Sequence, residues 1–136
     1  MAERPGVDAS LEAVLRDVTG GPGFGLVKFR QPNDETQIVY LDTWVRGLAS
    51  DHSYVLQRAV DTNLDGSCTS TAWLTLGKGL AAQAIMTDGN GTGRETLFRN
   101  LPLAPGTEFD IHFRVVDAGT LAPVLSSTCY RFVVSP

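Results

Sequence analysis

The chain has 136 residues, of which 43% are apolar and 19% are charged, and its formal net charge is −4. This composition predicts a single globular domain over residues 1–136 with a buried core, and it excludes a disordered chain. The acidic balance and the lack of a Lys/Arg cluster argue against nucleic acid as a partner. The apolar runs are too short for insertion into a membrane.

The N-terminal part of the chain is expected to be a flexible segment followed by a strand. We expect residues 1–10 to be flexible and to hold no signal peptide, because "MAERPG" is charged and is followed by no apolar h-region. Residues 11–18 fit a strand, but they also fit a short helix that Ser10 would cap and Gly20 would end. We favour the strand because the later segments have β character.

Residues 23–30, 36–48 and 53–61 are the next predicted strands. In 36–48, one face carries mostly apolar side chains: Val39, Leu41, Thr43 and Val45. Tyr40 and Trp44 lie on the opposite face. They would form either an exposed aromatic platform for a carbohydrate or protein edge, or part of a layer buried against a second sheet. Burial is the commoner fate of a strand tryptophan.

The stretch "DTNLDGSC", residues 61–68, begins like a calcium-binding loop. Its candidate ligands alternate before a glycine: Asp61, Asn63 and Asp65. An EF-hand would require a glutamate at the position of Ala72, so another segment would have to complete the site. The turn "TDGNGTGRE" offers three candidate donors: Asp88, Asn90 and Glu95. The alternative is a polar turn whose Asp and Asn side chains bond to the nearby backbone.

Five more strands are predicted: 70–77, 81–88, 94–101, 107–117 and 127–135. The clearest is 107–117, where two sets of side chains alternate: Phe109, Ile111, Phe113 and Val115 against Glu108, Asp110, His112 and Arg114. Three carboxylates alternate out of strands and are expected on solvated faces: Asp42, Asp61 and Asp110.

Turns rich in Gly, Pro, Asn and Asp separate these segments, which excludes βαβ units. We predict an all-β fold, an antiparallel Greek-key sandwich or barrel of about 8 strands. Residues 46–61 and 99–117 share an Arg, a Leu, a polar turn and a closing Val-Asp, as two crossovers between sheets would, and the alternative is an internal duplication. In this interpretation, Leu48 and Leu101 each close one end of the core. The Gly-Leu, turn and Tyr pattern at 47–54 suggests an immunoglobulin-like topology as the alternative.

Cys68 and Cys129 are the two cysteines, and their number alone does not tell a disulfide from two buried thiols. Neither belongs to a C-x-x-C pair, which argues against a redox dithiol and a zinc knuckle. A disulfide would imply an oxidising compartment, and hence a secreted or cell-envelope protein.

The middle of the chain resembles the copper/zinc superoxide dismutases. "GLASDHSYVLQRAVDTNLDGSCTS" is similar to the family's segment that runs from a Gly-Leu through a His-rich strand to Gly-Cys-Thr-Ser, with Ser67 inserted. "TDGNGTGRETLF" resembles the stretch after the family's zinc loop. "GTEFDIHFRVVDAG" resembles the strand of the last copper histidine, with His112 in register. The resemblance covers about residues 36–134 and implies the family's β-sandwich and its disulfide, here Cys68–Cys129.

The metal chemistry of that family does not carry over. Copper that cycles between oxidation states needs several imidazole ligands, whereas this chain has only His52 and His112. The family's His-x-His positions hold other side chains here: Tyr54, Leu56 or Gln57. The family's arginine before the last cysteine corresponds to about Ser126, and the His-rich zinc loop is missing. We therefore disfavour a divergent metalloenzyme and expect His112 to be a surface residue.

The sequence holds no G-x-S-x-G elbow, P-loop or H-E-x-x-H motif. We therefore predict a non-catalytic structural or binding module that is secreted or in the cell envelope, with a protein or carbohydrate as its ligand. A calcium-binding extracellular domain is the alternative, and calcium is the only cofactor that we consider. An edge strand could also pair with a second copy of the chain.

Overall fold

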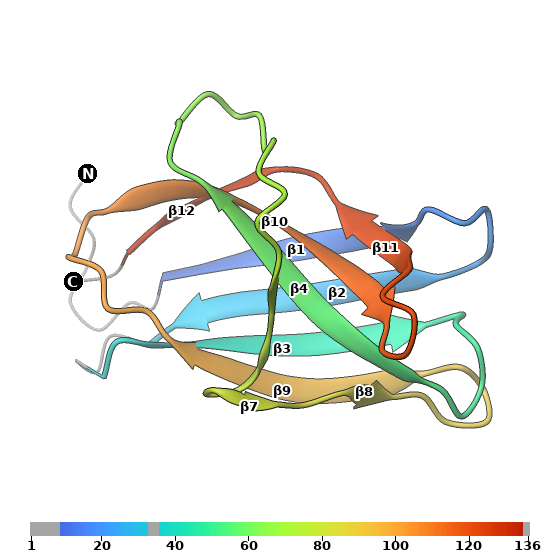
Figure 1. Ribbon diagram of the computed structural model, residues 1–136. Coiled ribbons are helices and arrows are strands. Elements are labelled where there is room, and N and C mark those ends of the chain that lie inside the picture. The colour runs from blue at the N-terminus through green and yellow to red at the C-terminus, as the bar shows by residue number, and fades with distance from the viewer. Residues whose placement is uncertain (1–8, 33–35, 135–136) are drawn as a thin grey trace.

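The computed structural model describes residues 9–32 and 36–134, and its regular elements in these residues are β-strands. The strands curve into a nearly closed, barrel-like sheet (Figure 1). The predicted all-β class is therefore confirmed. In the described part of the chain, no helix is long and apolar enough to span a membrane.

Six long strands form most of the barrel wall: β1 (Ala9–Asp17), β2 (Phe24–Gln31), β3 (Ile38–Arg46), β4 (Ser53–Asp61), β9 (Gly93–Asn100) and β10 (Glu108–Asp117). Six shorter strands complete it: β5 (Leu74–Thr75), β6 (Gly77–Lys78), β7 (Ala81–Ala82), β8 (Ile85–Met86), β11 (Pro123–Ser127) and β12 (Tyr130–Val133).

The main strand order is β5-β4-β10-β11-β1-β2-β3-β9-β6-β7. β12 pairs with the first half of β10, beside β11, and β8 pairs with the start of β4. β6 runs parallel to β9 where Lys78 meets Phe98, so the sheet is mixed and not purely antiparallel as predicted.

The gap between β4 and β9 is narrowed by β8, which pairs with β4 and lies against the start of β9. A Cβ added to Gly93 of β9 would stand 2.8 Å from the carbonyl oxygen of Met86. Only a glycine allows the two backbones to approach this closely. The barrel thus comes near to closure through short strands instead of one long ladder. These are β8, which pairs with β4, and the consecutive strands β5 and β6, which pair with β4 and β9.

The core fills the inside of the barrel with alternate residues of the long strands. The faces predicted for 36–48 and 107–117 are confirmed, since Leu41, Val45 and Phe113 are fully buried. Leu48 and Leu101 pack against this core from its periphery. Because β3 and β9 are antiparallel, these two residues follow strands that end on opposite sides of the barrel.

The strand boundaries agree with the sequence where an alternating apolar face faces the core. Of the predicted strand 11–18, residues 11–17 lie in β1 and not in the alternative helix, and the fourth predicted strand matches β4. Of the predicted flexible segment 1–10, residues 1–8 lie outside the described residues, whereas Ala9 and Ser10 begin β1.

Three predicted strands are wrong in their extent, and one strand is missing from the prediction. Residues 70–77 hold only β5 and part of β6, and residues 81–88 hold only β7 and β8. The predicted strand 127–135 begins with the last residue of β11 and holds β12 only from Tyr130 to Val133. β11 was not predicted, because its sequence "PVLSS" has no alternating apolar face. The described residues therefore hold twelve strands, several of them of two residues, in place of the predicted eight or so.

Candidate functional site

The stretch "DTNLDGSC" forms a loop that folds back on the carboxylate at its start. Asp61 accepts hydrogen bonds from the backbone amides of Thr69 and Ser70, both at 3.0 Å, and from the Thr69 hydroxyl at 3.1 Å. These bonds, the two amides foremost, hold the pKa of Asp61 below its ordinary value. Both carboxylate oxygens of Asp61 thus serve the loop's own backbone.

Asp110 anchors the same loop from the neighbouring strand. It accepts hydrogen bonds from the Arg131 guanidinium at 2.7 Å and from the Gly66 amide at 3.0 Å. The hydrogen bond from Arg131 has the largest effect on the pKa of Asp110 and lowers it, and the Gly66 amide lowers it further. Asp110 is 1% exposed and Asp61 is 9% exposed, so the expectation of solvated faces is wrong for both. They lie on the outer face of the sheet, but the loop covers them.

A disulfide between Cys68 and Cys129 fixes the far side of this loop to the connection between β11 and β12. From there the chain crosses the outer face of β4 and β10 on its way to β7 (Figure 1). The segment 62–76 is therefore a cover, held by one covalent bond and two buried carboxylates.

Beneath this cover lies a packed polar cluster on the outer face of β4 and β10. His112 Nε2 lies 3.1 Å from the carbonyl oxygen of Ser70, and its ring lies against Trp73. The Arg114 guanidinium lies over the Trp73 ring, 4.2 Å from its centroid, and Arg114 donates a hydrogen bond of 2.8 Å to Gln57 Oε1. His112 is thus partly buried and is not the surface residue that we expected.

Gln57 lies on β4, and its side-chain amide nitrogen donates a hydrogen bond to the Thr75 hydroxyl at 2.9 Å. His52 Nε2 forms a hydrogen bond with the carboxylate of Asp117. Asp117 is the last residue of β10, whereas Asp110 lies near the start of that strand. The structure therefore separates the two histidines. Among the described residues, no group of three or more His, Cys, Asp or Glu is placed to hold a metal ion.

The donor set considered for calcium is spread over the molecule. Asp88 follows β8, which pairs with the start of β4, whereas Asp61 ends that strand. At about 3.3 Å per residue, the length of β4 puts them roughly 26 Å apart. Asp88 accepts from the amides of its own turn, and Glu95 pairs with Lys78 at 3.0 Å. The structure thus does not bring these donors to Asp61, Asn63 and Asp65.

Tyr40 and Trp44 lie on the outer face of β3, partly exposed, and are not buried against a second sheet. Phe24 packs edge-on against Trp44, and Arg46 lies over both rings. Beside Trp44 is a shallow polar hollow lined by residues of β3, β6 and β9, among them Asp42, Lys78 and Arg94. This aromatic face is one candidate for a binding surface.

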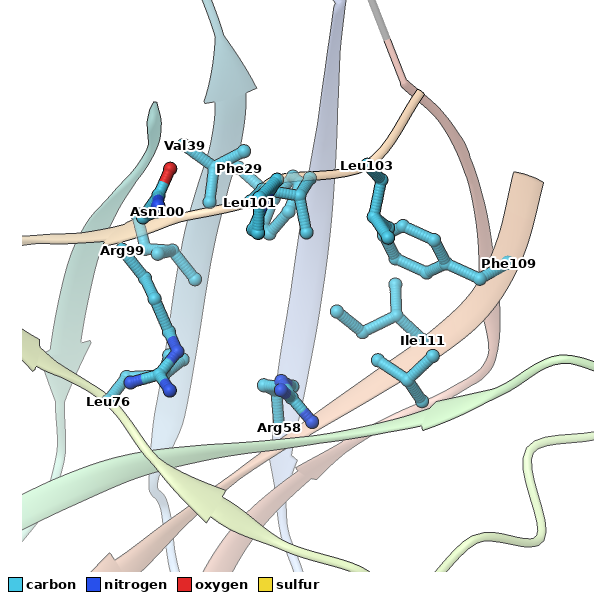
Figure 2. Close-up of a pocket in the computed structure, with 13 residues that line it drawn as sticks. Phe29, Val39, Arg58, Leu76, Arg99, Asn100, Leu101, Leu103, Phe109 and Ile111 are labelled. Carbon is cyan, nitrogen blue, oxygen red and sulfur yellow. The ribbon is translucent and has the colours of Figure 1, made fainter. Parts of the chain in front are cut away.

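A mostly apolar space lies inside the barrel, at the end where β9 leads into β10. It is a cavity of about 320 Å³. Its apolar wall comes from the strands and from the connection after β9: Phe29, Val39, Leu41, Val60, Leu76, Leu101, Pro102, Leu103, Phe109 and Ile111. Figure 2 shows Leu101, Leu103 and Phe109 directed into the same space.

Three polar residues complete the lining: Arg58, Arg99 and Asn100. Arg58 was not predicted as a site residue, although the sequence carries a signal for it. In "YVLQRAV" the alternation that buries Tyr54 and Leu56 places Arg58 on the same inward face. A charge at an inward position marks a place where the core is open or occupied by something else.

No protein-family model matches the chain, and no curated protein matches it.

Proposed function

We propose that this chain is a non-catalytic binding module of a secreted or cell-envelope protein, and that its ligand occupies the cavity at the end of the barrel. The observation that carries this proposal is the cavity itself, about 320 Å³ behind a mostly apolar wall. Protein interiors are normally packed with few spaces larger than a water molecule. Small-molecule sites have a mostly apolar lining with a few convergent polar groups.

The architecture that we propose is a Greek-key barrel related to that of the copper/zinc superoxide dismutases. The connections from β3 to β4 and from β9 to β10 support this topology. β3 and β9 pair with each other, and the strands that follow them, β4 and β10, form another pair, so both connections cross from one pair to the other. The disulfide from the loop after β4 to the residue before β12 also fits the resemblance. The proposed relationship concerns the fold and not the reaction, since the two histidines lie apart.

A secreted or cell-envelope location is supported by the same disulfide. Disulfides persist in oxidising compartments and are rare where glutathione keeps thiols reduced. Cys68 and Cys129 tie the cover 62–76 to the barrel, so an oxidising environment matters for the fold.

The aromatic face at Trp44 is the competing site, because a partly exposed tryptophan beside polar groups suits a carbohydrate or a protein edge. We rank it second, since Arg46 and Phe24 already cover part of the Trp44 ring. Calcium at residues 61–65 ranks third, because Arg131 supplies the positive charge beside Asp110 that a cation would supply.

The experiment that tests the proposed function uses a neutral naphthylamine dye whose emission rises in apolar surroundings. We expect the folded protein to bind the dye saturably, and Val60→Phe, which fills the cavity from β4, to abolish that binding. Val55→Phe is the matched control, because Val55 lies on the same strand and on the opposite face.

Equal dye binding by the two variants, or no saturable binding by the parent protein, would refute the proposal. Circular dichroism and thermal unfolding check that both variants fold. Unfolding in EDTA and in millimolar calcium runs in parallel, because a ligand that binds only the folded state raises the midpoint. A calcium-dependent rise that Asp65→Ala removes would move the assignment to residues 61–65.

A further inference from the structure

Two arginines face the cavity from different parts of the barrel wall, Arg58 on β4 and Arg99 on β9. In Figure 2 their guanidinium groups lie on the same side of the cavity, with Leu101 and Leu103 on the other side. The cavity is thus polarised, with positive charge at one side and an apolar wall at the other.

Neither arginine has an acidic partner within residues 9–32 and 36–134. Three other basic side chains of the barrel do have one, since Arg30 pairs with Asp42, Lys78 with Glu95, and Arg131 with Asp110. Basic residues such as Arg16 and Arg94 also lack an acidic partner within the described residues, but they are exposed to solvent, whereas Arg58 and Arg99 are partly buried beside the cavity.

The two charges also oppose each other. Burial is the main cause that lowers the pKa of Arg58, and the positive charge of Arg99 lowers it further. An arginine nevertheless stays protonated at neutral pH. The cavity wall therefore carries two like charges in partly apolar surroundings, which is unfavourable, and a bound anion would relieve both the repulsion and the loss of hydration.

We infer that the ligand is an anionic amphiphile, a carboxylate carried on an apolar tail, with the carboxylate held by Arg58 and Arg99 and the tail in the cavity. This inference rests on the proposed function, since it names the class of ligand for the same cavity. A guanidinium presents a fork of N–H donors that matches the two oxygens of a carboxylate. The tail contacts the apolar wall, among it Phe29, Val39 and Leu101.

The position of Arg99 gives the ligand its orientation. Arg99, Asn100 and Pro102 also line a surface hollow of about 270 Å³ that Gly79 and Leu80 complete. Arg99 therefore stands between the cavity and solvent, where a charged head keeps part of its hydration. Leu80, on the turn between β6 and β7, is 92% exposed and offers an apolar contact to a tail that enters there.

The test compares two competitors of the neutral dye that have equal chain length, decanoate and decanol. We expect decanoate to displace the dye from the parent protein at a concentration at least about tenfold lower than decanol, because charge-assisted hydrogen bonds contribute this much or more. Arg58→Gln and Arg99→Gln should each weaken decanoate about tenfold and leave decanol unchanged. Arg94→Gln is the matched control, an exposed arginine of the same strand β9 that lies outside the cavity.

A second measurement separates ligand recognition from a structural role. Without ligand, Arg58→Gln should unfold at the same or a higher temperature than the parent, since it removes an unpaired charge. A lower midpoint, together with unchanged decanoate binding by Arg99→Gln, would make the arginines structural and overturn the inference.

The remaining outcomes are equally decisive. Equal displacement by decanoate and decanol in the parent would overturn the inference but leave the proposed function standing, because the cavity would still bind apolar molecules. Displacement by acetate alone would assign the arginines to an anion without a tail, which contradicts the amphiphile. An absence of dye binding would remove the proposed function itself.

Discussion

At the scale of single residues, the carboxylates of the loop after β4 show why an oxygen-rich stretch is ambiguous. Asp61, Asn63 and Asp65 have the spacing of calcium ligands, yet both carboxylate oxygens of Asp61 accept hydrogen bonds from the amides of Thr69 and Ser70. The sequence cannot distinguish the two uses, because Asp and Asn suit turns and cation sites for the same reason. The structural use is decided by the hydrogen bonds that Arg131 and the Gly66 amide donate to Asp110. These are contacts between residues far apart in the sequence.

Asp61→Asn is therefore expected to destabilise the protein, and the thermal midpoint at pH 7 should fall by several degrees. An asparagine offers one acceptor oxygen where three hydrogen bonds are accepted, and it turns an NH2 group toward the loop's donors. Asp65→Asn is the control, since the Asp65 oxygen that accepts from the Ser67 amide is kept in asparagine. Equal midpoints for the two variants would contradict this role of Asp61.

The pH dependence follows from the same contacts. The pKa values of Asp61 and Asp110 are lowered in the folded protein, so their stabilisation is present above the unfolded value of about 4 and is lost as pH falls through the folded values. The difference in midpoint between the parent and Asp61→Asn should therefore shrink below about pH 4. A difference that stays constant down to the acid limit would show that the carboxylate charge is not what the loop needs.

At the scale of elements, prediction succeeded where one face of a strand faces the core. The alternating residues of β4 and β10 specify those strands, because a shift by one residue would expose the apolar face. Residues 70–77 alternate as well, but the segment changes its partner, since β5 pairs with β4 whereas β6 pairs with β9. A segment that passes from one neighbouring strand to another cannot remain one strand, and no local pattern reports that path.

Removal of the disulfide tests whether the cover 62–76 depends on it. Replacing both cysteines, Cys68→Ser with Cys129→Ser, should lower the free energy of unfolding by about 4 kcal/mol, because the bond closes a loop of 61 residues. Urea unfolding measures this change, and hydrogen exchange at the Thr69 and Ser70 amides reports release of the cover. A loss of stability below about 1 kcal/mol would mean that the two buried carboxylates, Asp61 and Asp110, are enough to hold the cover 62–76 on the barrel.

At the scale of the whole molecule, the sequence predicted the class of fold but not the binding site. The β class follows from local alternation, and the disulfide follows from the family resemblance. The cavity depends on how far the inward side chains of β2, β3, β4 and β10 fall short of filling the barrel, and on where Leu101 and Leu103 lie over its end. Packing defects of this kind are a property of the assembled core and have no local sequence pattern.

A methyl NMR titration with decanoate shows whether the ligand lies inside the barrel. We expect saturable shifts at the methyl groups of Val39, Leu101 and Leu103, which line the cavity, while Leu26, which pairs with Trp44 on β3, stays unchanged. Shifts at Leu26 with none at the cavity methyl groups would place binding on the aromatic face and refute binding inside the barrel.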